Sequence, residues 1–293
     1  MKIVISIVEF NTKDLLEKCL TQIYGEPVKN KLEVWIVDNN SEDDSVQMIE
    51  KKFPQVKLIK NQNNVGFGKA HNQVFKKAQA DYFLVLNPDT QFNITDIDQM
   101  TEFMQQHPSC GISSCKITDF KGKLQSNGGD LPFSLSLISW LFNLELLGNF
   151  PNFHRQDKSY YQSAHTVGWV GGTFMFIRNE VIKKSLAFNE DYFMYFEDTQ
   201  FCLDARKKGF EIMINPAVSI KHLGGASSKD PHLRQWLGEV QGLLYFYSKY
   251  FGAELAVVVK GLVYIAIILR IIAFSLLGKQ MAAKTYGKIL FKI

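Results

Sequence analysis

Only four of the 293 residues are cysteines, and their positions exclude the common structural uses of this residue. They form no CxxC pair and no Cys/His spacing of the kind that holds zinc. We therefore expect reduced, buried thiols, as in a cytosolic compartment, in preference to disulfides or a zinc centre. The four are Cys19, Cys110, Cys115 and Cys202.

Features of export, repetition and disorder are also absent from the sequence. Residues Met1–Ile5 run directly into a strand pattern, without a charged segment, a long apolar stretch or a cleavage site, so we expect no export. No internal repeat and no low-complexity linker interrupts the chain. With 46% apolar and 21% charged residues, the composition predicts an ordinary globular protein of one large domain, or one domain with an appendage.

Basic charge is concentrated at the C-terminal end of the chain. Seven basic residues and one acidic residue follow position 248, a net charge of +6, which leaves −2 for the rest of a chain whose total is +4. These bases are mixed with dense apolar residues, and the segment has little polar face. The pattern favours an anionic membrane surface as a partner over nucleic acid.

Short β-branched runs alternate with helical patterns over the first hundred residues. This alternation predicts an α/β fold with a mainly parallel sheet covered by helices. Strands are predicted at Lys2–Val8, Glu33–Val37, Val56–Ile59 and Tyr82–Leu86. Helices are predicted between them, at Lys13–Gln22, Asp44–Lys52 and Gly66–Ala78.

Each of these four strands is followed by a polar loop. In open α/β sheets, ligands bind beyond the carboxyl ends of the strands. Four polar loops at the same edge therefore predict a cleft there. The loops are Glu9–Asn11, Asp38–Ser41, Asn61–Gly68 and Asn87–Thr90.

The second half of the chain is less regular. Residues Leu131–Phe150 form a strongly apolar insertion. Strands are expected at Trp169–Ile177 and Phe210–Ile214, and the acidic segment Asp191–Asp204 lies between them.

Five motifs occur in the order typical of one known family. The sequence resembles the family 2 inverting glycosyltransferases with a GT-A fold, over about residues 1–250, and is most similar to their rhamnosyltransferase-like branch, which builds cell-surface polysaccharides. The resemblance implies a GT-A domain, the Rossmann-like mixed sheet of nucleotide-diphospho-sugar transferases, over residues 1–228. An amphipathic helical, membrane-associating region would follow over residues 229–293. The motifs are Ile7–Asn11, Trp35–Ser41, Asn87–Asp89, Gly171–Met175 and Tyr195–Asp198.

The donor nucleotide is the first ligand that the resemblance implies. A carboxylate that follows a strand, such as Asp38, can accept hydrogen bonds from a base or ribose, and the family uses the matching Asp in this way; a helix cap is the alternative. The loop Asn63–Gly68 offers backbone N–H groups and a helix start to an anion, although a simple turn would have the same sequence. The implied donor-nucleotide residues are Glu9, Asn11, Asp38, Asn64, Gly66, Asn72 and Asn87.

A metal ion is the second implied ligand. Asn87-Pro88-Asp89 stands where the family carries its DxD-type metal motif, which implies Asp89 as a ligand, with a Pro-Asp turn as the structural alternative. A hard divalent cation, Mg²⁺ or Mn²⁺, takes oxygen ligands and neutralises the donor diphosphate. His222 matches a family position that contacts the metal or the diphosphate. Further phosphate contacts are suggested at Lys221, Ser227 and Ser228.

The catalytic residues are implied by the Glu197-Asp198 pair. Inverting transfer needs a base that takes a proton from the acceptor hydroxyl as the hydroxyl attacks the sugar carbon. The Asp of the family's Glu-Asp pair has this role, which maps to Asp198, with Glu197 as its neighbour; an acidic pair at a helix N-terminus is the alternative. The aromatic run Tyr192–Phe196 would exclude water and raise the pKa of the base.

The acceptor side is implied by a glycine turn. Gly171 and Gly172 resemble the family's acceptor-side glycines, whose lack of side chains permits close approach. Trp169 would either stack on a sugar ring or pack in the core. The chain departs from the family pattern at Gln200 and Asp204, where relatives carry a second Asp and an Arg.

The apolar segment Leu255–Leu277 is long enough to span a membrane, but Lys260 and Arg270 interrupt it. An Arg at the bilayer centre costs about 2.5–3.5 kcal/mol on the insertion scale. Tyr264 and Ser275 share one stripe of the helix with the two bases. We therefore expect the helix to lie on the membrane with its bases at the lipid headgroups. A core helix or an oligomer interface is the alternative.

These features predict transfer of a sugar, such as rhamnose, from a dTDP- or UDP-sugar to a lipid-linked saccharide at the cytoplasmic face of the inner membrane. The expected partners are the nucleotide sugar, the lipid-linked acceptor and the membrane surface, and a homo-oligomer is possible. One alternative is a non-catalytic, membrane-bound module that binds sugar nucleotides or assists assembly. A sugar nucleotidyltransferase is a weaker one, because those enzymes carry a Gly-rich basic loop where this chain has Glu9–Asn11.

Overall fold

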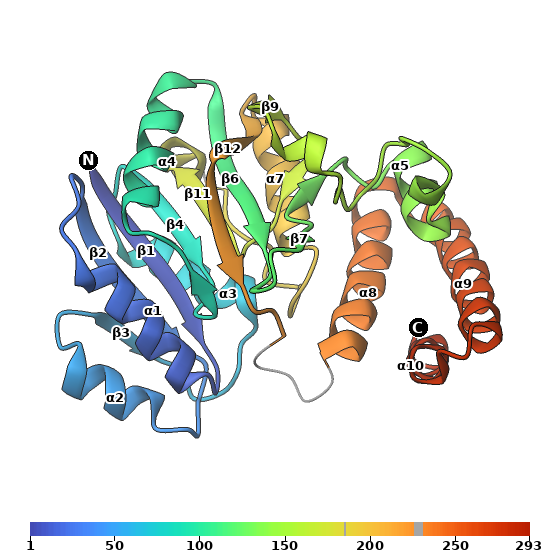
Figure 1. Cartoon of the computed structure of the whole chain (residues 1–293), viewed down its shortest axis with the longest axis horizontal. Helices are drawn as coiled ribbons and strands as arrows, with labels where there is room; N and C mark the ends of the chain where they lie inside the picture. The colour runs from blue at the N-terminus through green and yellow to red at the C-terminus, as the bar shows by residue number, and fades with distance from the viewer. Residues whose placement is uncertain (185, 226–230) are drawn as a thin grey trace.

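A mixed β-sheet forms the centre of the protein, with helices on both faces and three further helices beside it (Figure 1). The computed structural model describes residues 1–184, 186–225 and 231–293. The main strands are β1 (Lys2–Glu9), β2 (Lys31–Asp38), β3 (Lys57–Lys60), β4 (Tyr82–Leu86), β6 (Cys110–Thr118), β11 (Phe174–Arg178) and β12 (Glu211–His222). Short strands are β5 (Thr90–Gln91), β7 (Leu124–Gln125), β8 (Gly128–Gly129), β9 (His165–Thr166) and β10 (Trp169–Val170).

The strand order is β3-β2-β1-β4-β11-β6-β12-β5, which confirms the predicted α/β fold with a mixed sheet. The first four strands of the chain pair in parallel, whereas β11 is antiparallel to both of its neighbours. All five residues of β4 are buried, as expected for a central strand covered on both faces. The parallel strands therefore end at one edge, where their loops meet.

Two hydrophobic cores lie on opposite faces of the sheet. One contains residues of α1 (Lys13–Gly25), α2 (Ser45–Lys52) and α4 (Thr95–Gln106). The other contains residues of α3 (Phe67–Lys77) and α7 (Glu197–Lys207), and it continues into the three C-terminal helices. These helices are α8 (Pro231–Phe251), α9 (Ala253–Leu276) and α10 (Gln280–Leu290). The remaining helical segments are α5 (Ser134–Phe142), α6 (Asn179–Lys183), η1 (Leu144–Leu146) and η2 (Lys158–Tyr161).

The predicted strands and helices of the first hundred residues are all present, with ends that shift by a few residues. The single strand predicted over Trp169–Ile177 is wrong. Gly171–Thr173 separates β10, which pairs with β8, from β11, which belongs to the main sheet. The strand predicted at Phe210–Ile214 is the start of the longer β12, whose register shifts between Asn215 and Ser219. The predicted domain boundary after residue 228 lies outside the described residues.

The four cysteine side chains are free and buried, as predicted. Burial raises the pKa of the Cys19 thiol to about 12, with a smaller contribution from the nearby charge of Asp89. The thiols are therefore protonated and unreactive near neutral pH.

The apolar insertion Leu131–Phe150 folds into α5 and η1 and packs on the C-terminal helices (Figure 1). Arg270 of α9 donates hydrogen bonds from Nη2 to the carbonyl oxygen of Trp140, at 3.0 Å, and to Oδ1 of Asn143, at 3.1 Å. Both acceptors lie at the C-terminal end of α5, where carbonyl groups lack helical partners. The side chain of Arg270 thus links the insertion to α9 by hydrogen bonds.

Helix α9 has one face on the protein and one face exposed. Val259, Val263, Ala266 and Ile267 are buried. The exposed face is apolar over most of the helix length, and its larger side chains are Leu255, Val257, Val258, Ile265, Ile268, Leu269, Ile272 and Leu276. By length and composition, with a mean hydropathy of 2.5, this helix is able to cross a membrane. Arg270, one of the two bases of the predicted stripe, donates hydrogen bonds to the end of α5, and the placement of the stripe at lipid headgroups stays a prediction.

Candidate active site

A large cavity of about 1440 Å³ opens beyond the carboxyl ends of β1 and β4 and continues between the sheet and the C-terminal helices. It is lined by loops of the sheet, by the segment after α5, and by α8, α9 and α10. The cleft predicted from the polar loops is therefore present, and it extends beyond the edge of the sheet to the C-terminal helices. The predicted site residues that line it are Asn64, Gly66, Asn87, Asp89, Trp169, Gly171, Gly172, Glu197, Asp198 and His222.

Asp89 and His222 meet at one wall of the cavity. Asp89 follows β4, His222 ends β12, and Oδ1 of the former lies 3.2 Å from Nε2 of the latter. The other carboxylate oxygen, Oδ2, accepts a hydrogen bond of 2.9 Å from the backbone N–H of Gly224. Burial alone would raise the pKa of Asp89, but the hydrogen bond and charge of His222 and the Gly224 N–H lower it overall. The carboxylate is therefore ionised at neutral pH.

The imidazole of His222 is oriented by Gln125. Gln125 donates from Nε2 to the carbonyl oxygen of His222, at 3.0 Å, which turns its own Oε1 toward Nδ1 of the ring, at 2.9 Å. Nδ1 must then carry a proton, and Nε2 faces the Asp89 carboxylate. This is the arrangement of a metal-binding histidine, held by an outer hydrogen bond with its free nitrogen toward the ion.

The donor set fits a divalent cation that is completed by other ligands. A carboxylate oxygen and an imidazole nitrogen lie close together, and the side-chain amide of Asn87 is 3.5 Å from Nε2 of His222. Within the described residues, no group of three or more His, Cys, Asp or Glu side chains forms a complete cage. Such a two-ligand site suits a metal that is shared with donor phosphates and water. The predicted contacts Ser227 and Ser228 lie outside the described residues, and Lys221 is exposed on β12.

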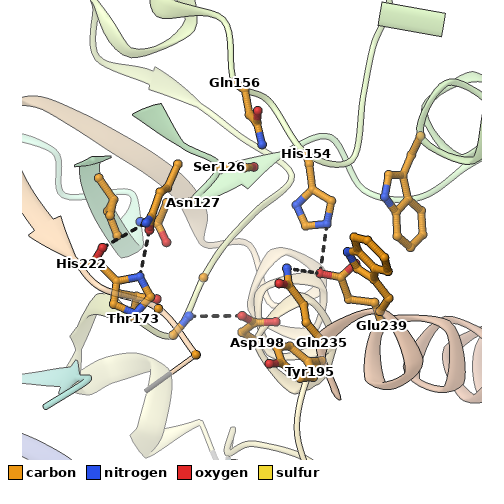
Figure 2. A pocket seen from close by; sticks show the side chains of 18 of the residues that line it. Ser126, Asn127, His154, Gln156, Thr173, Tyr195, Asp198, His222, Gln235 and Glu239 are labelled. Atoms are coloured by element: carbon orange, nitrogen blue, oxygen red, sulfur yellow. Dashed lines mark hydrogen bonds and ion pairs between the residues drawn. The ribbon is translucent and has the colours of Figure 1, made fainter. Parts of the chain in front are cut away.

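Asp198 and Glu197 begin α7 on the floor of the cavity. Oδ2 of Asp198 accepts a hydrogen bond of 3.1 Å from the backbone N–H of Gly172 (Figure 2). Oδ1 accepts one of 2.7 Å from the N–H of Thr199. Burial raises the pKa of Asp198, and these N–H groups oppose the shift. Burial, together with the charge of Asp198, raises the pKa of Glu197 well above its usual range, and Glu197 Oε2 has no hydrogen-bond partner among the residues that the structure describes. The Asp198 carboxylate is thus held in place by two backbone N–H groups, beside a second buried carboxyl group.

The residues before this pair have a strained backbone that α8 supports. Tyr195 and Phe196 have φ angles of 74° and 72°, which side chains other than glycine rarely adopt. Gly238 and Gly242 of α8 lie directly against them, so that a Cβ on Gly238 would be 2.4 Å from Tyr195 and a Cβ on Gly242 would be 2.7 Å from Phe196. The C-terminal region therefore sets the position of the catalytic helix.

Gly242→Ala is expected to displace Phe196 and with it the start of α7, lowering kcat by about tenfold or more, because misplacing reacting groups by 1 Å costs about 10²-fold. Overpacking should also lower stability by about 1–3 kcal/mol. Gly261→Ala in α9 is the matched control, since its Cβ would meet nothing within 4 Å. Thermal unfolding and kcat would be measured together. Unchanged kcat in Gly242→Ala would show that α8 does not position the pair.

The wall beyond β2 carries the residues expected to meet the nucleotide. Asn39 donates to the carbonyl oxygen of Gly66, at 3.2 Å, and joins two of the predicted loops. Gly66 has a φ of 88°, and a Cβ there would be 2.4 Å from the Phe193 carbonyl oxygen, so glycine is required. Asp38 does not line the cavity, yet its Oδ1 is buried without a partner, while Oδ2 accepts from two backbone N–H groups. An unpaired buried acceptor of this kind suits a donor group on a ligand.

Three other predicted donor residues do not line the cavity. Glu9 is fully buried, accepts hydrogen bonds from Thr12 and Ser45, and has a pKa raised by burial to about 7. Asn11 bridges two loops through the N–H of Glu42. Asn72 uses its amide in hydrogen bonds to Phe188 and Glu190. The structure gives these side chains supporting positions around the site, and direct donor contact by Asn72, whose amide bonds within the protein, stays a prediction.

Trp169 is also placed differently from its prediction as an acceptor platform. The side chain is buried, its ring N–H donates to the carbonyl oxygen of Phe153 at 2.9 Å, and the two rings stack with centroids 4.6 Å apart. The core interpretation is therefore correct for the ring. Gly171 and Gly172 fit the predicted turn, since a Cβ on Gly171 would be 2.7 Å from Asn127.

Several lining residues were not singled out from the sequence. His154 and Glu239 face each other above Asp198, with Nε2 of the ring 3.5 Å from Oε1 of the carboxylate (Figure 2). Gln235 donates to the same oxygen at 3.0 Å. These side chains come from the segment after α5 and from α8, far apart in the sequence, and no local motif marks them. Gln125 and Asn127 were missed for the same reason.

The raised pKa of Asp198 predicts the pH dependence of catalysis. A base works only when ionised, so activity should fall as pH drops through the pKa of Asp198, and burial moves this loss to a higher pH than for an exposed aspartate, about 3.9. A pH profile of kcat would show one acid limb above this value and a plateau at higher pH. An acid limb at or below pH 4 would contradict a desolvated base.

The mixed sheet has the GT-A fold, with Asp89 after β4 and a buried acidic pair at the start of α7. Residues 4–186 match the model of the family "Glycosyl transferase family 2", and the chain belongs to this family. It is therefore a sugar-transferring enzyme, with the rhamnosyltransferase-like character that the sequence motifs predicted.

Among curated proteins, the chain is similar to the N-acetylglucosaminyl-diphospho-decaprenol L-rhamnosyltransferase of Mycobacterium tuberculosis, with 26% identity over 68% of this chain and 69% of the relative. It is also similar to the rhamnosyltransferase WbbL of Escherichia coli K12, with 23% identity over 74% and 82%. Among solved structures, the mannosyltransferase PcManGT of Pyrobaculum calidifontis, in complex with GDP-Man and Mn²⁺, aligns with 99% of this chain and 74% of its own, at a TM-score of 0.59 and 15% identity. The last likeness shows the fold alone.

Proposed function

We propose that this glycosyltransferase moves a sugar from a nucleoside-diphosphate donor to a lipid-linked saccharide at a membrane surface, with inversion at the sugar carbon. One observation carries the proposal: the same cavity contains the Asp89–His222 pair, the buried base Asp198 and a long wall formed by the apolar C-terminal helices. The proposed donor site, the base and the proposed path of the acceptor thus lie in one continuous cavity. A dTDP- or UDP-sugar is the proposed donor, with rhamnose favoured by the names of the two relatives.

Asp198 acts as the base in this proposal. Its Oδ1 accepts hydrogen bonds from the N–H and the hydroxyl of Thr199, whereas Oδ2 accepts one from the N–H of Gly172 and keeps a lone pair for an acceptor hydroxyl. The hydroxyl gives its proton to Asp198 and forms a bond to the sugar carbon, while the bond from that carbon to the diphosphate breaks. Burial and the charge of Asp198 raise the pKa of the neighbouring Glu197 well above its usual range, which disfavours a second negative charge beside the leaving diphosphate.

Asp89 and His222 are the proposed metal ligands, with Mg²⁺ or Mn²⁺ as the ion. When bound, the ion would supply positive charge to the diphosphate as it leaves. Asn87 and the backbone around Gly224 lie beside this pair and are placed to contact the phosphate oxygens. Asp38, Asn64 and Gly66 are proposed to hold the nucleoside.

The departures at Gln200 and Asp204 favour catalysis over a non-catalytic module. Gln200 is buried and bonds to Asn189, and Asp204 accepts a hydrogen bond of 2.6 Å from Tyr250. Neither residue lines the cavity, so their exchange leaves the base and the metal pair intact. The nucleotidyltransferase alternative lacks support, since the loop Glu9–Asn11 contains no glycine and no base.

Nucleotide release would test the proposed reaction. UDP-, dTDP- and GDP-sugars would be offered with Mg²⁺ or Mn²⁺ and a lipid extract that contains polyprenyl-linked saccharides. We expect release from one donor only, dependent on the extract and abolished by EDTA. Metal-dependent donor binding without release, even with the extract, would favour the binding module instead.

The membrane surface is proposed to meet the exposed apolar face of α9 at the cytoplasmic side of the inner membrane. Because the opposite face is buried on the protein, the helix is placed to lie on the bilayer with one face in lipid. Replacing Ile268 and Ile272 by Glu should abolish pelleting with anionic vesicles, since both side chains are exposed on this face. The control adds the same charges at exposed Gln47 and Gln55. Equal pelleting of the two variants would rule out this surface.

A further inference from the structure

Arg270 is a cation in an apolar part of the cavity, and within the described part of the chain no carboxylate pairs with it. The face of α9 that lines the cavity consists of Val263, Ile267, Arg270 and Phe274, which recur every three or four residues. Among the described residues, no carboxylate lies within ion-pair distance of its guanidinium. A partly buried charge without an opposite charge is costly unless something else supplies it.

The hydrogen bonds of Arg270 leave part of its guanidinium free. Both of its hydrogen bonds use Nη2, toward Trp140 and Asn143. A guanidinium has five N–H donors, so those on Nε and Nη1 remain for another acceptor. Its fork-like shape matches two oxygens of a phosphate. The ring of Tyr286 lies below the charge, with its centroid 5.7 Å away, and supports the orientation.

The walls around Arg270 are suited to an amphipathic ligand. Trp236 and Tyr286 stack with centroids 4.5 Å apart, and Phe274 stacks on the other side of Tyr286 at 5.7 Å. All three line the cavity, and the outer face of the same helix is the exposed apolar surface described above. The cation is therefore located where the cavity approaches the proposed membrane surface.

Polar side chains occupy the path from Arg270 to the base. His154 and Glu239 lie above Asp198 (Figure 2), and the charge of His154 lowers the pKa of Asp198, which places the two groups close together. Burial raises the pKa of Tyr286, the charge of Arg270 lowers it and the charge of Glu239 raises it. Both charged groups therefore lie near the ring of Tyr286. In order, the cavity offers a base, hydrogen-bonding groups for sugar hydroxyls, and then a cation among aromatic rings.

From this order we infer that Arg270 binds the diphosphate of a polyprenyl-diphosphate saccharide, whose sugar lies at His154 and Glu239 and whose chain leaves toward the membrane along α9. The inference rests on the proposed lipid-linked acceptor and gives it a site. The arginine that made a membrane-spanning helix costly then has a role as the acceptor's anion ligand. Lys260 on the same helix does not line the cavity and is not part of the site.

Binding of farnesyl diphosphate would test the site directly. It would be compared with farnesol and with inorganic pyrophosphate, in neutral detergent and with EDTA present, so that the Asp89–His222 pair holds no metal. We expect wild type to bind farnesyl diphosphate more tightly than either compound, and Arg270→Gln to bind it about 10- to 100-fold more weakly. Lys260→Gln, which removes one charge from the same helix, should bind as wild type does.

Several outcomes would overturn the inference. Equal binding of farnesyl diphosphate and farnesol by wild type would exclude a diphosphate site without any variant. Pyrophosphate bound as tightly as farnesyl diphosphate would exclude a lipid ligand. Equal binding by wild type and Arg270→Gln would place the anion elsewhere.

A second variant, Arg270→Lys, distinguishes a binding role for Arg270 from a purely structural role as a cap on α5. Arg270→Lys keeps the charge but not the fork, and it should bind farnesyl diphosphate more tightly than Arg270→Gln, whereas equal loss in both would indicate a cap only. Nucleotide release with native lipid extract separates the inference from the proposed function. Nucleotide release that does not depend on Arg270 would refute the diphosphate site but support the proposed transferase reaction. Arg270-dependent binding of farnesyl diphosphate without any nucleotide release would support the site but contradict the proposed reaction.

Discussion

Asp198→Asn is expected to lower kcat by about 10²- to 10⁴-fold, the usual contribution of a general base. The amide has nearly the same shape as the carboxylate but does not take a proton, so donor affinity should change little. Both Asp198 oxygens accept hydrogen bonds from backbone N–H groups in the wild type. Nucleotide release at saturating donor and acceptor would measure the loss, and donor binding would be measured separately.

Asp204→Asn is the matched control for this substitution. Asp204 belongs to the same helix, α7, and accepts a hydrogen bond from Tyr250, but it does not line the cavity. Its kcat should stay near that of wild type. If Asp198→Asn kept most of its activity, or if both variants lost it equally, Asp198 would not be the base.

Asp89→Asn is expected to lower kcat/KM by about 10³-fold, because it removes a charged ligand of the metal ion. The ion is expected to stabilise the negative charge that develops in the transition state by several kcal/mol. Metal-dependent donor binding should be lost with it. Asp81→Asn is the control, since Asp81 precedes β4, at the opposite end of the strand from Asp89, and its carboxylate accepts a hydrogen bond from the backbone N–H of Lys2. Isothermal titration of Mn²⁺ with and without the nucleoside diphosphate would measure both variants.

The role of Gln125 distinguishes a metal site from a simple Asp–His ion pair. Gln125→Leu removes the hydrogen bonds that orient the His222 ring and should weaken metal affinity by about 10- to 100-fold. An ion pair between Asp89 and His222 would need no such orientation. Unchanged Mn²⁺ affinity in Asp89→Asn would refute the assignment of this pair.

Much of the sheet was predictable because its signals are local. The apolar strands β1, β2 and β4 and the helices between them follow from periodicity, and parallel pairing follows from their alternation. The division of Trp169–Ile177 into β10 and β11 was not predictable in this way. Both parts are apolar, and the break comes from Gly172, whose Cβ would lie 2.7 Å from the ring of Phe67, a contact between distant segments.

The site was predictable where one motif carries the chemistry. Asp89, His222, Glu197 and Asp198 came from family motifs and all line the cavity. The hydrogen bonds of the Asn72 amide to the backbone of Phe188 were not predictable, because they join segments more than a hundred residues apart. The amphipathic stripe of α9 was correct in sequence, yet its surroundings depend on α5, and only the fold brings Arg270 to that helix.

The anomeric configuration of the product is the most direct test of the account. The donor that the protein uses would be converted with a soluble or lipid-linked acceptor, and the configuration at the transferred sugar carbon would be compared with that of the donor by NMR. Direct displacement assisted by the single base Asp198 predicts inversion. Retention would require a covalent intermediate or a different attack geometry, and it would contradict the role assigned to Asp198.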